Sequence, residues 1–508
     1  MFAKTYGSTT LGVDGVIIDV EVDVSNGLPG FDLVGLPDPS VKESRERVRT
    51  AIKNAGIRIP AGHVTINLAP ADIRKDSSGL DLPMAIALLA AYGLVPPTAL
   101  NGCLFAAELS LEGELRGIHG ILPMAIQAKR RGFSTLFTAP DNANEALLVE
   151  GIRVYALPSL SRIIEFLNGR KECRPAEKTA VVQPDVSERD DFADVQGQFL
   201  AKRAFEIAAA GGHNLLLIGA PGSGKTMLAR RMPSILPAMT PREALEVTKI
   251  YSIAGLLRDN AGLMEQRPFR SPHHTTSAAA MIGGGSMPRP GEVTLSHHGV
   301  LFLDELPEFG KSSLEALRQP LEDSMVTVSR VHASLTFPAS FVLIAAMNPC
   351  PCGYQGDSQQ ECTCTPNEIR HYTRKISGPL LDRIDIHIRV PRVAYQELVA
   401  KEKAESSACI RERVSAARDI QLKRLEKYHI FCNAQMNHAM LRRTCPLTEG
   451  AQRLLAQVFQ QKSLSARSYD RIIKVSRTIA DLAGSRGIEE QHIAEAVQLR
   501  NDIGLQPE

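Results

Sequence analysis

The chain has 508 residues, 44% of them hydrophobic and 22% charged, which is typical of a globular protein with about two to four domains. Its 58 Lys and Arg against 56 Asp and Glu give a formal net charge of +2, so any nucleic-acid-binding surface must be local. The N-terminus has no apolar signal core, the longest apolar run is too short to span a bilayer, and nine cysteines are an odd number, so we expect a reduced, cytoplasmic protein without a membrane span or a disulfide framework.

Residues 1–170 are predicted to form an α+β domain. Alternating apolar and polar residues rich in Val and Ile indicate strands, a charged run before a glycine indicates a surface helix, and a longer apolar run indicates a buried helix. The predicted elements are strands at 16–24 and 64–68, helices at 40–54 and 82–94, and a hairpin within 102–115.

Two segments of this domain, 75–85 and 108–115, resemble the proteolytic domain of Lon-type proteases and the similar domain of the RadA recombination ATPases. On the protease pattern, Gly79 falls at the position of the nucleophilic serine and Leu122 at that of its lysine partner. A serine nucleophile needs an adjacent base, and the run 113–128 contains no lysine. We therefore expect a non-proteolytic domain that is either an inactive scaffold or a DNA-contacting ring.

The strongest motif follows the apolar run 215–218 and precedes good helix formers. It fits the P-loop pattern G-x-x-x-x-G-K-[ST] without a mismatch, and its residues are Gly219, Ala220, Pro221, Gly222, Ser223, Gly224, Lys225 and Thr226. Backbone N–H groups of such a loop and of the following helix bind phosphate oxygens. Lys225 is expected to reach the β- and γ-phosphates and Thr226 to hold Mg²⁺, so the motif predicts an ATP site.

An apolar run at 299–303 ends in two adjacent carboxylates, Asp304 and Glu305, about eighty residues after the P-loop. This arrangement is typical of a Walker B element. Asp304 is expected to act at Mg²⁺ and Glu305 to polarise the attacking water. An acidic pair after an apolar run also marks ordinary strand ends, so the prediction depends on the preceding P-loop.

Residues 194–198, just before a predicted helix at 199–210, resemble the adenine-contacting stretch of AAA+ ATPases. The predicted strand 341–346 then ends at Asn348, which matches the sensor-1 position of that family, although an asparagine before proline also caps turns. Arg383, in the run 378–385, is the candidate arginine finger, with a salt bridge to Asp382 or Asp385 as the alternative.

Alternation over 325–337 predicts a β-hairpin with Arg330 and His332 near its tip. It resembles the pre-sensor-1 hairpin of AAA+ helicases, which implies DNA contact by these two residues. Charge on an ordinary edge strand is the alternative. The nearby insertion 267–276 contains His273 and His274, and a second pair, His297 and His298, follows; a structural or pore-loop role is favoured over metal or phosphate binding.

Four of the nine cysteines lie within fifteen residues, as two C-x-C pairs separated by nine residues. The candidate ligands are Cys350, Cys352, Cys362 and Cys364. A compact set of four thiolates suits a structural Zn²⁺ site, and free thiols or a redox disulfide remain as alternatives.

Residues 171–191 are polar, contain proline and lack periodicity, so they are predicted to be a linker between the first domain and the nucleotide-binding core at 192–395. Residues 396–508 are predicted to be helical, with helices at 396–425, 464–483 and 488–499. In AAA+ lids an arginine at such a helix start is the sensor-2 residue, for which Arg467 is the first candidate and Arg471 the second.

The core resembles the magnesium-chelatase AAA+ subunit, and the whole chain resembles the ComM/YifB family of competence proteins, most particularly over 350–385. The resemblance implies three parts: a Lon-protease-like α+β domain, an α/β P-loop AAA+ core and an α-helical lid. It also implies a homo-hexameric, Mg²⁺-dependent ATPase that drives branch migration of single-stranded and branched DNA in homologous recombination and natural transformation. Other recombination proteins are further implied partners, and a membrane is not.

Two other functions stay open. A chelatase-type motor would remodel a protein partner, and would need a separate metal-binding subunit. A Lon-like ATP-dependent protease would need a nucleophile and base in the first domain, where Gly79 and Leu122 argue against it.

Overall fold

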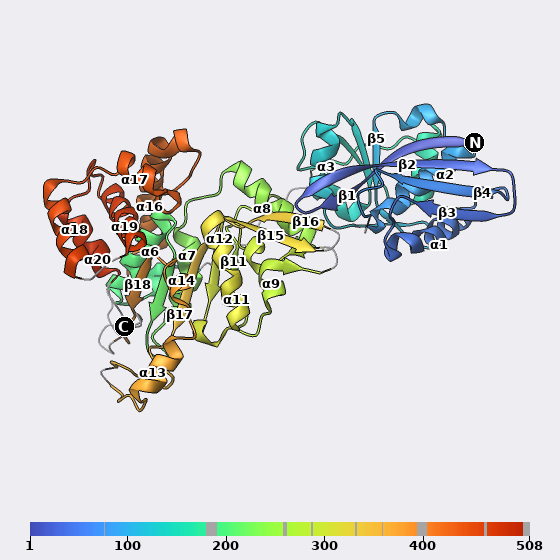
Figure 1. The fold of residues 1–508 in the computed structure, drawn as a ribbon. Coiled ribbons are helices and arrows are strands. Elements are labelled where there is room, and N and C mark those ends of the chain that lie inside the picture. Colours follow the sequence, from blue (N-terminus) through green and yellow to red (C-terminus); the bar gives the residue numbers. More distant parts are fainter. Residues whose placement is uncertain are drawn as a thin grey trace. The chain divides into compact units, whose positions relative to one another are not determined.

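The computed structural model describes residues 1–75, 77–178, 190–257, 262–285, 288–330, 333–357, 359–393, 404–461 and 465–500 (Figure 1). The chain divides into two compact units. The first comprises Met1–Pro184 and Ala244–Met264, and the second Asp185–Glu243 and Glu265–Glu508. Among the described residues, no helix combines the length and the apolar composition that crossing a membrane requires.

A four-stranded mixed sheet forms one half of the first unit. Its strands, in spatial order, are β1 (Phe2–Leu11), β2 (Asp14–Ser25), β4 (His63–Ala69) and β3 (Gly30–Val34), with β3 and β4 parallel and the other pairs antiparallel. Helices α1 (Pro39–Asn54) and α2 (Asp81–Ala91) pack against it, and every residue of α2 is buried. The predicted strands and helices of this half are confirmed, whereas the sequence pattern predicts neither β1 nor β3.

A three-stranded parallel sheet forms the other half. Its strands, in spatial order, are β5 (Cys103–Ala106), β8 (Thr135–Thr138) and β9 (Arg153–Ala156), accompanied by helices α3 (Ile121–Arg130), α4 (Ala143–Ala146) and α5 (Leu160–Leu167). The predicted hairpin is wrong in its first strand, because β5 pairs in parallel with β8. The antiparallel pair in this part of the chain is formed by the two-residue strands β6 (Glu108–Leu109) and β7 (Leu115–Arg116). All residues of β5 are buried, and a strand buried on both faces lacks the apolar–polar alternation that sequence analysis relies on.

Most of helix α8 (Pro241–Ala254), which follows the P-loop helix in the chain, belongs to the first unit. Lys249 Nζ lies 2.7 Å from Asp14 Oδ1, and the Ser252 hydroxyl donates to Glu145. Burial raises the pKa of Glu145, against the hydrogen bonds that it accepts from Ser252 and Leu122. Nothing in the sequence pattern of α8 indicates this placement.

A five-stranded parallel sheet lies at the centre of the second unit (Figure 1). Its strands, in spatial order, are β11 (Phe269–Arg270), β14 (Val300–Leu303), β17 (Val342–Met347), β10 (Leu215–Ile218) and β18 (Ile386–Arg389). Both β10 and β14 are fully buried apolar strands, and the predicted strands of this core are confirmed. Helices α6 (Phe199–Gly211) and α7 (Lys225–Ile235) pack against the sheet.

Shorter elements complete the core. They are α9 (Ala278–Ile282), β12 (Gly283–Gly284), β13 (Arg289–Pro290), α10 (Glu292–Leu295), α11 (Lys311–Ala316), α12 (Arg318–Asp323), β15 (Met325–Arg330), β16 (Ala333–Pro338), α13 (Pro366–Thr373) and α14 (Gly378–Leu381). The C-terminal part is helical, with α16 (Ser407–Leu425), α17 (His438–Thr444), α18 (Glu449–Gln461), α19 (Ala466–Leu482) and α20 (Glu490–Gln498). The helices predicted at 464–483 and 488–499 are confirmed as α19 and α20. The helix predicted over 396–425 begins only at Ser407, and its residues 396–403 lie outside the described part of the chain.

A buried polar network joins the sheet to helix α19. His213 Nδ1 lies 3.1 Å from Asp385 Oδ2, and its Nε2 lies 2.8 Å from the Thr478 hydroxyl. Arg471 Nε reaches Asp385 Oδ1 at 3.4 Å. Burial raises the pKa of Asp385, but the hydrogen bond with His213 and the charges of Arg471 and Lys474 outweigh it and hold the pKa well below the usual range. Asp385 therefore stays ionised. A buried carboxylate can remain charged only when partners such as these offset the cost of burial.

We expect His387 on β18 to make folding pH-dependent. Burial, then the charges of Arg500 and Arg471, lower its pKa to about 3, so the folded chain keeps the ring neutral while the unfolded chain protonates it near pH 6.5. Its contribution to stability is complete above pH 6.5 and is lost as the pH falls, by about 1.4 kcal/mol at pH 5.5.

The variant His387→Gln has no such proton to bind. Its free energy of unfolding in urea should therefore fall less between pH 7.5 and 5.5 than that of the wild type. The exposed His119→Gln serves as the control. Equal pH slopes in the wild type and His387→Gln would contradict the assignment.

Candidate functional site

The loop between β10 and α7 has the backbone geometry of a phosphate-binding loop. Gly224 caps α7 with a φ of 85°, and Gly222 has a φ of 77°, both in the left-handed region that glycine tolerates best. A Cβ on Gly219 would lie 2.4 Å from the Val390 carbonyl oxygen, so this position has no room for a side chain. The first N–H groups of α7 thus follow a glycine turn, as anion binding at a helix N-terminus requires.

Lys225 is buried and turned into this loop. Its Nζ donates to the carbonyl oxygens of Gly219 (2.7 Å) and Ala220 (3.0 Å), and lies 3.3 Å from Asn348 Oδ1. Burial lowers the pKa of Lys225, and the nearby Asp304 partly offsets that effect. The ammonium group is therefore held between the loop and the end of β17.

The Walker B carboxylate meets the P-loop threonine. The Thr226 hydroxyl donates to Asp304 Oδ2 at 2.7 Å, and the other oxygen of Asp304 accepts from the Glu305 backbone N–H at 3.0 Å. Glu305 has a φ of 52°, which turns the chain sharply after β14, and its side chain is exposed. Hydroxyl and carboxylate oxygens are the ligands that Mg²⁺ prefers, so Thr226 and Asp304 fit this ion.

The predicted site residues around the phosphate loop are thus brought together by three neighbouring strands. Thr226 and Lys225 follow β10, Asp304 follows β14, and Asn348 follows β17, which lies between the other two. Parallel strands end at one edge of the sheet, and ligands of open α/β sheets bind at that edge.

Gln198 forms a hydrogen bond with the backbone of the P-loop. It has a φ of 52°, is buried, and its Nε2 donates to the Ser223 carbonyl oxygen at 2.7 Å. The resemblance to AAA+ ATPases predicts that the stretch 194–198 contacts adenine, and this hydrogen bond places the end of that stretch against the P-loop.

Sequence reasoning missed His274 as a neighbour of Glu305. His274 Nδ1 lies 3.3 Å from Glu305 Oε2. The loop that carries it is fixed by a turn, in which Thr276 N–H donates to the His273 carbonyl oxygen, and by the Ser313 hydroxyl, which donates to the Thr276 carbonyl oxygen. A pair of adjacent histidines after a strand carries no signal that singles out one of them for this contact.

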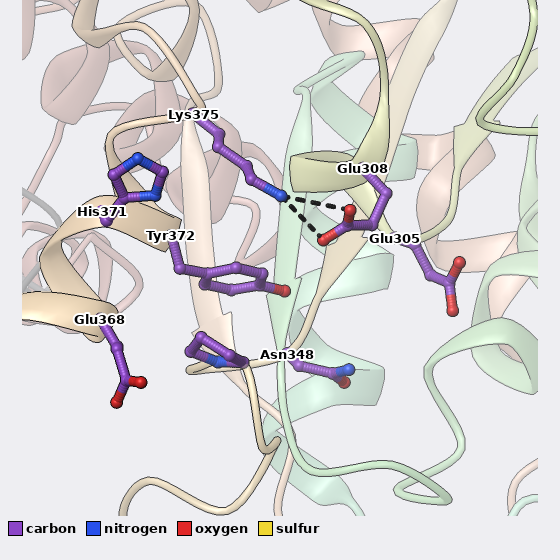
Figure 2. A pocket seen from close by; sticks show the side chains of 8 residues that line it. Glu305, Glu308, Asn348, Glu368, His371, Tyr372 and Lys375 are labelled. Carbon is purple, nitrogen blue, oxygen red and sulfur yellow. Dashed lines mark hydrogen bonds and ion pairs between the residues drawn. The ribbon is translucent and has the colours of Figure 1, made fainter. Parts of the chain in front are cut away.

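A pocket of about 380 Å³ opens beside Glu305 and Asn348 (Figure 2). Its lining residues are Glu305, Glu308, Asn348, Pro351, Glu368, His371, Tyr372 and Lys375. The last four come from α13 and the turn after it, which no sequence motif marked as part of the site.

The predicted arginines are placed differently from one another. Arg383 is buried, donates to the Pro379 carbonyl oxygen at 2.6 Å and pairs with Glu322. The alternative of a salt bridge to Asp382 or Asp385 is therefore not what the structure shows. Arg467 is exposed in the first turn of α19, and the second candidate, Arg471, pairs instead with Asp385.

The four cysteines of the loop 350–364 converge. Their sulfur atoms all lie within 4.8 Å of one another, and three of the Sγ–Sγ distances are 3.3, 3.6 and 3.6 Å. Backbone N–H groups of Cys352 and Gln355 donate to Cys364 Sγ and Cys350 Sγ, both at 3.3 Å. Tetrahedral Zn²⁺ with bonds of about 2.3 Å needs sulfurs about 3.8 Å apart, so the four thiols fit this ion.

The predicted hairpin is confirmed as β15 and β16, which pair antiparallel from Met325↔Pro338 to Arg330↔Ala333. Its exposed face carries two cross-strand hydroxyl pairs, Thr327 with Thr336 at 3.3 Å and Ser329 with Ser334 at 2.9 Å. Arg330 ends β15, and His332 lies outside the described residues.

Comparison with known proteins identifies the family. Three models match the chain: "Magnesium chelatase, subunit ChlI" over residues 191–398, "Subunit ChlI of Mg-chelatase" over 20–142, and "Magnesium chelatase, subunit ChlI C-terminal" over 404–500. Competence protein ComM of Haemophilus influenzae is 44% identical over 509 residues, which cover 99% of this chain and 98% of that protein. The chain belongs to the ComM/YifB family.

YifB of Escherichia coli is 44% identical over 497 residues, 96% of this chain and 95% of that protein. A more distant relative, the magnesium-chelatase 67 kDa subunit of Chlorobaculum parvum, is 28% identical over 164 residues, which are 31% of this chain and 23% of that subunit. The predicted membership of the ComM/YifB family is confirmed, and so is the magnesium-chelatase-like AAA+ character of the second unit.

Proposed function

We propose that this chain is an AAA+ ATPase that drives branch migration of DNA during homologous recombination and natural transformation. The observation that carries the ATPase part is the cluster at the ends of β10, β14 and β17, where Lys225 contacts Asn348 and Thr226 contacts Asp304. The DNA part rests on the ComM/YifB family, because the relative from Haemophilus influenzae is named a competence protein.

Each residue has a role in this proposal. The loop N–H groups and Lys225 bind the phosphates, and Asn348 and Glu305 orient a water for in-line attack on the γ-phosphorus. A bond forms from the water oxygen to phosphorus, the bond to the β–γ bridging oxygen breaks, and ADP leaves with that electron pair. Glu305 accepts the proton that the water releases.

Thr226 and Asp304 would hold Mg²⁺, which when bound would neutralise phosphate charge. Arg383 is assigned as an arginine finger for the ATP of a neighbouring copy, which requires an oligomer, and Arg467 is assigned as sensor 2. The homo-hexamer that we propose as the active form rests on the resemblance to the ComM/YifB family. In this role Arg383 would exchange its pairing with Glu322 for the γ-phosphate. The N-terminal unit is assigned as a Lon-like, non-proteolytic domain that handles DNA.

The hairpin β15–β16 is the proposed DNA contact, through Arg330 and His332. Its exposed hydroxyls support this role, since hydroxyl groups donate to phosphate oxygens without reading sequence. The four cysteines are proposed to hold a structural Zn²⁺, which would link the two ends of the loop 350–364.

Two substitutions separate binding from hydrolysis. Lys225→Ala removes the charge that faces the phosphates, so we expect nucleotide affinity to fall by about a hundredfold or more. Glu305→Gln keeps the loop, so it should bind ATP like the wild type and lose turnover by about a hundredfold. Titration with a fluorescent ATP analogue and a phosphate-release assay measure the two effects. Near wild-type turnover by Glu305→Gln would exclude it as the base.

Branch migration is tested on a synthetic mobile DNA junction with ATP and Mg²⁺, with Lys225→Ala as the control. We expect ATP-dependent strand exchange by the wild type and none by the control. An ATPase that no DNA stimulates and that leaves the junction intact would instead favour a protein-remodelling motor.

The zinc proposal predicts one ion per chain in the purified protein, measured by elemental analysis. Cys350→Ser should lose the ion, because a hydroxyl is a poor substitute for thiolate at a Zn²⁺ site. The exposed Cys409→Ser, outside the cluster, should retain it. Wild-type protein that lacks zinc after purification in zinc-containing buffer would contradict this assignment.

A further inference from the structure

We propose that α13 and the turn after it are part of the hydrolysis site, with Tyr372 and Lys375 as the residues that position Asn348 and the segment of Glu305. This inference rests on the proposed ATPase function and adds two residues to it that no motif of the chain contains.

The first argument is the contact between Lys375 and Glu308. Lys375 Nζ lies 3.2 Å from both carboxylate oxygens of Glu308, which ends the short helical turn Leu306–Glu308 directly after Glu305 (Figure 2). Glu305 itself has a left-handed backbone conformation. The orientation of its carboxylate therefore depends on where the turn that follows is held, and Lys375 holds the far end of that turn.

The second argument is the position of Tyr372. It is buried, and in Figure 2 its ring points from α13 toward Asn348 and Glu308, whereas Glu368 points away from them. The backbone of Asn348 interacts with the phenol oxygen and by itself lowers the pKa of Tyr372. Burial, then the charge of Glu308, raise the pKa of Tyr372 to about 12, so the hydroxyl keeps its proton at neutral pH.

The third argument is the way in which this segment is anchored. Asn348 is two residues before Cys350, and α13 begins two residues after Cys364, so the cysteine cluster joins the two sides of the pocket. The same loop also approaches the P-loop, because a Cβ on Gly353 would lie 2.7 Å from the Pro221 ring. The position of α13 is therefore linked, through the loop 350–364, to both the phosphate loop and the end of β17.

A structural role of the Lys375–Glu308 pair alone would be small. Both side chains are about half exposed, at 41% and 46%, and such surface pairs contribute only about 0–1 kcal/mol to folding. Removing the lysine should leave the fold intact, which makes turnover an informative measurement.

The test measures ATP affinity and turnover of Lys375→Met, Lys375→Arg and Tyr372→Phe in the full chain. We expect Lys375→Met to lower kcat about tenfold with ATP-analogue affinity within about twofold of the wild type, since a misplaced catalytic group affects the transition state and not the bound phosphates. Lys375→Arg should retain at least about half of kcat. Tyr372→Phe, which keeps the ring, should lower kcat about threefold or more at unchanged affinity.

Two controls complete the design. Lys171→Met removes a comparably exposed lysine beside Glu165 and should leave kcat unchanged. The double variant Lys375→Met with Glu308→Gln should be no slower than Lys375→Met alone, because the two residues act as one pair.

Retention of kcat within twofold of the wild type by Lys375→Met, or by Tyr372→Phe, overturns the assignment of that residue. A parallel loss of ATP affinity and kcat, or additive losses in the double variant, also overturns it. A wild-type chain that does not hydrolyse ATP would instead contradict the proposed function.

Discussion

The site depends on one constraint, which is that the buried Lys225 ammonium must find oxygen partners at the edge of the sheet. Two loop carbonyls and the amide oxygen of Asn348 supply them. A buried ammonium group without partners would destabilise the fold. The hydrogen bonds of Lys225 therefore hold the loop and the end of β17 together. The Thr226–Asp304 hydrogen bond does the same between α7 and β14. The groups proposed to bind phosphate and Mg²⁺, Lys225 and Thr226, and the group proposed to orient the attacking water, Asn348, therefore lie at one edge of the sheet.

A second polar centre lies between the core and α19. Asp385 binds His213 and Arg471 at once, and the Thr478 hydroxyl continues the chain of contacts into the helix. Arg383 precedes Asp385 by two residues, and Arg467 precedes Arg471 by one helical turn. Both proposed nucleotide-sensing arginines therefore lie near this network in the chain, and the carboxylate of Asp385 stays ionised only while its partners remain in place.

Much of the fold was predictable wherever periodicity or a motif is strong. The strands around the P-loop, the hairpin 325–337 and helices α16, α19 and α20 of the C-terminal part follow their patterns, whereas the sequence analysis does not predict α17 and α18. The parallel strand β5 does not, because it is buried on both faces and has no alternation to report its partner. The placement of α8 with the first unit is also invisible in its sequence, since it depends on Asp14 and Glu145, more than a hundred residues earlier in the chain.

The sequence alone determined the identity of the P-loop, of the carboxylate pair Asp304–Glu305 and of the four-cysteine cluster, because each requires particular residue types at short spacing. It also determined the family, through motifs spread over the whole chain. Only the tertiary structure decided that His274 meets Glu305, that Lys375 meets Glu308 and that Arg383 pairs with Glu322 rather than with Asp382 or Asp385. The physical reason is distance along the chain: each of these contacts forms between segments that tertiary folding brings together, and spacing in the sequence carries no record of which side chains meet.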